Sequence, residues 1–94
     1  MAIGVLTLEL RLPGCTSLKE KRGRLKPLLA RLHREFNLSV AEMDRQDQWQ
    51  EAVITCAVVG NDAAHLQRSL QTVSDWVEKN WRDVTVVDDQ FELL

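Results

Sequence analysis

The chain has 94 residues, of which 45% are hydrophobic and 28% are charged, and its formal net charge is −2. This size and composition are typical of a single soluble globular domain with a modest core. No apolar run is long enough to span a bilayer and strand-like residues begin at once, so we expect no signal peptide, no membrane contact and a cytoplasmic protein.

The small net charge hides an uneven distribution along the chain. Residues 1–36 contain eight Lys or Arg and three Asp or Glu, whereas residues 37–94 contain four and eleven. The first part therefore carries +5 and the second −7. This asymmetry favours a basic patch for an anionic partner, unless folding brings the two parts together and neutralises both.

Residues 3–12 alternate with a period of two, which predicts a strand with one face on the core. The residues on that face are Leu6, Leu8, Leu10 and Leu12. Pro13 and Gly14 then end the strand. Ser17 and Glu20 have the spacing of a capping box, so we expect the first helix to begin directly after Ser17.

The start of this helix is the first candidate binding site. A helix N-terminus offers free N–H groups and the positive end of a dipole, and Lys19, Lys21 and Arg22 follow at once. These features predict a place for a phosphate. A well-capped helix with a solvated basic face, which needs no ligand, is the simpler explanation of the same residues.

The helix predicted over residues 18–36 has three kinds of side-chain row. An apolar stripe for the core consists of Leu18, Leu25, Leu29, Leu32 and Phe36. Two pairs have the spacing of ion pairs along a helix: Glu20–Arg24 and Arg31–Glu35. A further stripe has no such partners within the helix: Lys19, Arg22, Lys26 and His33.

The rest of the chain predicts two strands, a helix and a last strand. A strand over residues 38–44, whose facing is ambiguous, leads into a polar loop with Arg45 and Trp49. Residues 53–59 are apolar on both faces and predict a central strand. Asn61 or Asp62 caps a helix that ends near residue 80, residues 84–87 form the last strand, and an acidic tail follows.

This order predicts one α+β domain over residues 1–94 with the ferredoxin-like βαββαβ arrangement. We expect a four-stranded antiparallel sheet of order 4-1-3-2 with both helices on one face. The predicted core consists of Leu6, Leu8, Leu10, Leu25, Leu29, Leu32, Ile54, Val58, Leu66, Leu70 and Val73. The other face of the sheet is apolar for one that meets water, so a second subunit, a partner or the C-terminal tail is expected to cover it.

Several stretches together resemble the YlxP-like family of small bacterial proteins, a domain of unknown function. They lie at residues 3–6, 13–15, 17–22, 25–28, 40–42, 44, 46–47, 49–50 and 52–53, and the run at 17–22 is the most specific. The resemblance implies a ferredoxin-like fold. It also implies work on RNA or the ribosome, because the genes of the family often lie near those for translation initiation and ribosome maturation. Gly23 stands where the family commonly has a basic residue, and Arg45 where it commonly has His, which argues against a catalytic His in that loop.

We therefore expect a non-enzymatic RNA- or ribosome-associated factor that binds phosphates through its first helix. The expected contacts are Ser17, Lys19, Lys21, Arg22 and Lys26, with Arg45 and Trp49 as loop contacts. The central strands lack the stacking aromatics of an RNA-recognition motif. Two alternatives stay open: a dimeric structural or assembly protein acting through the open sheet face, and an acylphosphatase-like enzyme, although the Gly-rich phosphate loop of that family is absent.

The Cys and His residues give no signal of a metal or cofactor. Cys15, Cys56, His33 and His65 have no ligand spacing, so we expect neither. Cys15 has no evident neighbouring base to activate it as a nucleophile. We expect no disulfide in the cytoplasm.

Overall fold

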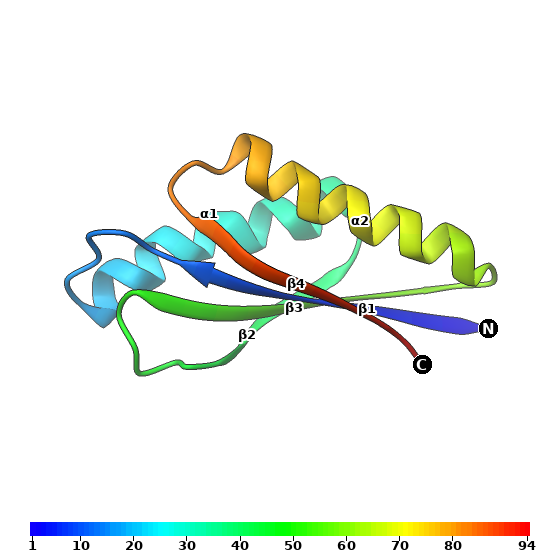
Figure 1. The fold of residues 1–94 in the computed structure, drawn as a ribbon, viewed down its shortest axis with the longest axis horizontal. Coiled ribbons are helices and arrows are strands. Elements are labelled where there is room, and N and C mark those ends of the chain that lie inside the picture. Colours follow the sequence, from blue (N-terminus) through cyan, green and yellow to red (C-terminus); the bar gives the residue numbers. More distant parts are fainter.

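The computed structural model describes residues 1–94. Its elements in chain order are β1 (Ala2–Arg11), α1 (Leu18–Phe36), β2 (Ser39–Asp44), β3 (Glu51–Gly60), α2 (Ala63–Asn80) and β4 (Thr85–Leu93). The strands form one antiparallel sheet in the order β2-β3-β1-β4, and both helices cover the same face (Figure 1). The predicted ferredoxin-like arrangement is confirmed. Neither helix is both long enough and apolar enough to cross a membrane.

The alternation predicted for the first strand is confirmed by its burial. Leu6, Leu8 and Leu10 are buried beneath the helices, while the odd-numbered residues of β1 face the other way. β1 pairs along its whole length with β3, where Leu8 lies opposite Ile54. The same parity holds in β3, so the two central strands together present one apolar floor to the helices.

The first helix buries part of its predicted stripe together with two residues beside it, Lys21 and Leu28. Its buried residues are Lys21, Leu25, Leu28 and Leu32, whereas Leu18, Leu29 and Phe36 are only partly buried. Phe36 turns toward α2, where its ring meets that of Trp76 edge-on with centroids 5.7 Å apart. The predicted stripe is thus confirmed at Leu25 and Leu32, and Leu29 and Phe36 pack against the core from its edge.

The second helix follows its predicted pattern. Asp62 caps it, accepting from the backbone N–H groups of Ala64 and His65. Leu66, Leu70 and Val73 are buried as predicted, but Val58 on β3 is only partly buried.

The last strand is longer than predicted, since β4 runs through the acidic pair to Leu93. The register with β1 shifts between Glu9 and Leu10, which pair with Asp88 and Val86, so Val87 is an extra residue in β4. This bulge reverses the alternation and turns Asp89 toward α2, where the hydroxyl of the buried Ser74 donates to its carboxylate over 2.8 Å. The tail therefore forms an edge strand and does not cover the open face.

The central position of Leu8 leads to a stability prediction. Leu8 is fully buried, so Leu8→Ala is expected to lower the free energy of unfolding by about 2–5 kcal/mol through lost transfer energy and the cavity left behind. Met43→Ala, at a side chain that is 58% exposed, should change it by about 0.5 kcal/mol or less. Urea unfolding followed by circular dichroism measures both, and equal effects would contradict the register of β1.

Candidate nucleic-acid interface

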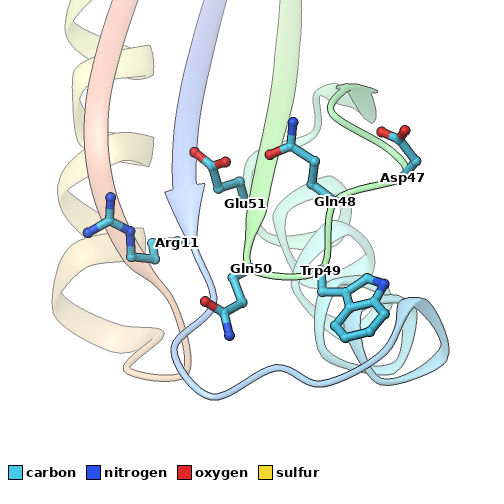
Figure 2. A pocket seen from close by; sticks show the side chains of 6 residues that line it. All are labelled: Arg11, Asp47, Gln48, Trp49, Gln50 and Glu51. Atoms are coloured by element: carbon cyan, nitrogen blue, oxygen red, sulfur yellow. The ribbon is translucent and has the colours of Figure 1, made fainter.

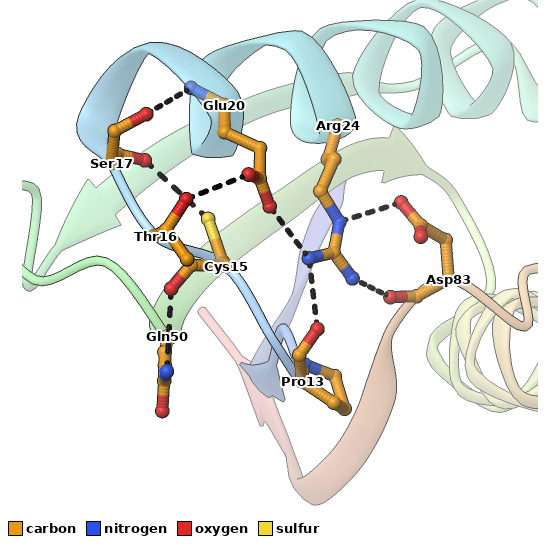
Figure 3. Close-up of polar contacts among 8 residues, drawn as sticks. All are labelled: Pro13, Cys15, Thr16, Ser17, Glu20, Arg24, Gln50 and Asp83. Carbon is orange, nitrogen blue, oxygen red and sulfur yellow. Dashed lines mark hydrogen bonds and ion pairs between the residues drawn. The ribbon is translucent and has the colours of Figure 1, made fainter.

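The turn between β1 and α1 is held against the loop between β2 and β3. The N–H of Leu12 donates to the carbonyl of Gln50 over 2.9 Å. The side-chain amide of Gln50 donates to the carbonyl of Cys15 over 3.2 Å, as Figure 3 shows. Cys15 is fully buried, and its thiol donates to the carbonyl of Ser17 over 3.4 Å. These bonds bring two polar loops together at the end of the sheet where α1 begins.

The start of α1 is capped as predicted, but only by half of the capping box. The Ser17 hydroxyl accepts from the Glu20 N–H over 3.0 Å, whereas the Glu20 carboxylate accepts from the Thr16 hydroxyl over 3.1 Å instead of returning to Ser17. The Thr16 hydroxyl is the main reason that the pKa of Glu20 lies below its ordinary value. The protein's own carboxylate therefore stands at this helix N-terminus. The Ser17 hydroxyl serves the cap, and its contact with a phosphate stays a prediction.

Arg24 ties this turn to the loop between α2 and β4 (Figure 3). Its Nε lies 2.9 Å from Oδ2 of Asp83, its Nη1 donates to the carbonyl of Pro13 over 3.0 Å, and the predicted pair with Glu20 is present at 3.4 Å. The hydrogen bond with Asp83 is the main cause that raises the pKa of Arg24. The charge of Arg24 is therefore compensated by carboxylates of the same chain.

Lys21 lies in the core, which corrects its assignment as a phosphate contact. The side chain is 1% exposed, and its Nζ lies 2.8 Å from Oε2 of Glu42 on β2 and donates to the carbonyl of Arg45 over 2.8 Å. No other polar group contacts that Glu42 oxygen, so the ammonium of Lys21 alone compensates its charge. An ammonium so enclosed stabilises the junction of α1 with β2 and is not accessible to a ligand.

Arg45 begins the polar loop as predicted, and its charge is already paired within the chain. It follows β2 with a left-handed backbone (φ 56°), and its guanidinium forms an ion pair with Glu9 on β1 and lies 3.8 Å from Glu51 on β3. The bond to Glu9 is the first cause that raises the pKa of Arg45. Its charge sits on the open face of the sheet, compensated by two carboxylates and apart from the cations of α1.

The remaining predicted cations lie on the outer side of α1. Lys19, Arg22 and Lys26 are exposed and form no ion pair within the chain. Sequence reasoning missed Arg34, which is also exposed and unpaired, because its helical position is beside the stripe and not on it. His33, which is on the stripe, places Nδ1 2.6 Å from the carbonyl of Leu38 and helps to close the helix end.

Trp49 lies at the same end of the molecule as the start of α1. It is 52% exposed in the β2–β3 loop, and Figure 2 shows its ring on the side that faces the loop leading into α1. Trp49 lines a shallow depression in the surface together with five polar residues: Arg11, Asp47, Gln48, Gln50 and Glu51.

Folding neutralises only part of the basic first third of the chain. Lys21, Arg24 and Arg31 acquire carboxylate partners, and the guanidinium of Arg31 also lies 5.5 Å from the ring centroid of Trp76. The acidic residues of β4, by contrast, lie at the edge of the sheet opposite to β2, the strand that α1 packs on. The outer side of α1 therefore keeps its positive charge.

The Cys and His side chains form no site in this structure. No group of three or more His, Cys, Asp or Glu residues is placed to hold a metal ion. Burial raises the pKa of the Cys56 thiol to about 12, so the thiol is protonated at neutral pH and a poor nucleophile.

Comparison with known proteins confirms the predicted family. The family model described as "Protein of unknown function (DUF503)" matches residues 3–90. The uncharacterized protein YlxP of Bacillus subtilis (strain 168) is 34% identical over 76 residues, which cover 81% of this chain and 83% of that protein. Among solved structures, the de novo designed protein Foldit4 is similar in fold, with a TM-score of 0.53 and 14% identity over 100% of this chain and 97% of that one.

The buried pair of Lys21 and Glu42 leads to a second prediction. Lys21→Met removes the ammonium and leaves a carboxylate that is only 20% exposed without its partner, so the free energy of unfolding is expected to fall by about 3 kcal/mol. Adding Glu42→Leu removes the stranded charge and should recover most of the loss. Urea unfolding of the wild type, both single variants and the double variant gives the coupling energy. Strictly additive losses would show that the two side chains do not stabilise each other.

Proposed function

Since the chain belongs to the DUF503 family of proteins of unknown function, we propose its function from the exposed cations of α1. We propose that the protein is a non-enzymatic RNA-binding factor of the cytoplasm, whose target includes ribosomal RNA. The observation that carries this proposal is the stripe of Lys19, Arg22 and Lys26, hereafter the α1 stripe, whose charges have no partner in the chain.

The shape of this surface suits an extended polyanion. Lys19 and Arg34 are fifteen residues apart on the same helix, so the exposed cations extend over about 22 Å at 1.5 Å per residue. The exposed surface between them includes Gly23, with open space where a side chain would stand, and Ala30. Such low relief lets a phosphate backbone lie close to the helix. Contacts of this kind give affinity that is largely independent of base sequence.

Single-stranded RNA fits this end of the molecule better than the sheet. The open-face residues of β1 and β3 include no aromatic side chain, so the sheet offers no stacking platform of the RNA-recognition type. Trp49, half-exposed beside the turn that leads into α1, is an aromatic surface on which one base can stack. We infer that the α1 stripe binds the backbone and that Trp49 receives a base.

The charge contribution is testable by salt dependence. Each phosphate contact to a single strand adds about 0.7 to the slope of log affinity against log salt, so Arg22→Gln with Lys26→Gln should flatten the slope by about 1.4 and weaken binding roughly 25-fold at 0.1 M salt. The measurement is fluorescence anisotropy with a labelled single-stranded RNA oligonucleotide, repeated with purified ribosomal RNA as competitor.

The matched control removes the same two charges from α2. Arg68 and Lys79 are exposed and have no ion-pair partner. The double variant Arg68→Gln with Lys79→Gln therefore has the same net charge as the α1 double variant and replaces the same residue types. This control should keep nearly the wild-type affinity and slope. Equal losses in both double variants would leave only net charge as the cause, and absence of RNA binding by the wild type at low salt would refute the proposal.

The stacking contribution has a different signature. Trp49→Ala is expected to weaken RNA binding by about 1–3 kcal/mol, as for the loss of one stacked base, without a change in salt slope because no charge is removed. Since Trp49 is 52% exposed, the thermal midpoint should shift little. Trp49→Phe keeps a stacking ring and should retain most of the affinity. Unchanged affinity in Trp49→Ala would remove Trp49 from the interface.

A further inference from the structure

The face of the sheet turned away from the helices has no cover within the chain. Both helices lie on the other side, and the C-terminal residues continue β4 at the sheet edge (Figure 1). This open face is formed in its centre by the odd-numbered residues of β1 and β3. Val59, near the end of β3, is 63% exposed on this face.

The open face divides into an apolar and a charged half. Ile3 and Val5 on β1 lie opposite Val59 and Ala57 on β3 in the apolar half. The four strands have ten, six, ten and nine residues, so at about 3.3 Å per residue and about 4.8 Å between strands the face covers about 550 Å² per copy. Two such faces would bury about 1,100 Å² in total, which exceeds the roughly 1,000 Å² that a biological interface needs when its complementarity is good. The face is therefore large enough for a second sheet.

The charged half contains a cation without a partner. Arg11, at the end of β1, is exposed and forms no ion pair, although Glu51 is its register partner on β3. The Glu51 carboxylate has only a 3.8 Å contact with Arg45. Both side chains belong to the open face, and neither charge is closely compensated within the chain.

We propose that a second copy of this chain covers the open face, related to the first by a two-fold axis that lies parallel to the strands, between β1 and β3. This axis exchanges the two central strands, so β1 of one copy lies over β3 of the other. Ile3 and Val5 then meet Val59 and Ala57 of the partner copy, and Arg11 meets Glu51 of the partner copy twice by symmetry. The two sheets pack face to face, as in an aligned sandwich.

The pairing of Arg11 with Glu51 distinguishes this axis from one that runs across the strands. Ser39, Ala57, Val5 and Glu92 form one row across the sheet. A two-fold axis across the strands at this row sets β4 over β4 and Glu92 against itself, which is unfavourable. The axis parallel to the strands sets Glu92 over the neutral Ser39 of the partner copy and Arg11 over Glu51, and it also sets Asp88 over Asp44 in the row of Glu9 and Val53.

The orientation is tested by mixing two single variants. Arg11→Glu places carboxylates at both positions 11 and 51 of the chain, and Glu51→Arg places cations at both. Each variant alone is expected to sediment as a monomer where the wild type is a dimer, because like charges then face each other across the interface. An equimolar mixture should restore the dimer, since every contact between positions 11 and 51 of opposite copies becomes one of opposite charge.

The outcomes are read by sedimentation velocity over a concentration series, with circular dichroism to confirm folding. Arg68→Glu, the same charge change on α2, should remain dimeric, and Val5→Glu should be a folded monomer that neither variant rescues. A wild type that stays monomeric at millimolar concentration, single variants as dimeric as the wild type, or a mixture that stays monomeric would each overturn the proposal. If Glu51→Arg does not fold, the loss of the dimer in Arg11→Glu and in Val5→Glu, against Arg68→Glu, still decides whether this face self-associates.

Discussion

The buried ammonium of Lys21 is the contact on which the arrangement of charges in this protein depends. It joins the first helix to Glu42 on β2 and to the carbonyl of Arg45 at the end of that strand. By binding that carbonyl it helps to hold Arg45 in a left-handed backbone conformation, from which the guanidinium reaches Glu9 across β3. One enclosed cation thus positions the helix on the sheet and a second cation on the open face. Burying an ion pair gains little net stability by itself, but removing one partner is costly, so the pair serves mainly to fix the geometry.

Local patterns predicted most of the fold. The alternation of leucines in residues 3–12, the cap at Ser17 and the apolar stripe of the second helix are set by neighbours along the chain, and each is confirmed. The predictions that are wrong depend on distant contacts. Lys21 is buried because it meets Glu42 on β2, and β4 extends through Asp88 and Asp89 because β1 offers a free edge and a bulge accommodates the acidic pair.

Only the exposed cations of the candidate site could be predicted from the sequence. Lys19, Arg22 and Lys26 have no carboxylate at helical spacing, and this local property predicted that they are unpaired within the helix. Lys21 looks the same along the sequence, and only Glu42, twenty-one positions further on and brought near by the sheet, separates it from the others. Arg45 is similar: its partners Glu9 and Glu51 belong to two other strands. A charge can therefore be assigned to a ligand only after the long-range ion pairs are known.

The two proposed surfaces occupy opposite layers of the domain, and this has a consequence for binding. Because the sheets would face each other, both copies of α1 would lie on the outside of the dimer with their cations in solvent. A short RNA segment then reaches only one stripe, whereas two segments of one folded RNA can occupy both. Linking two sites in this way converts the second contact into an intramolecular one, whose effective concentration depends on the span between the segments. A dimer of this geometry therefore favours RNA targets that present two strands on opposite sides of it over isolated single strands.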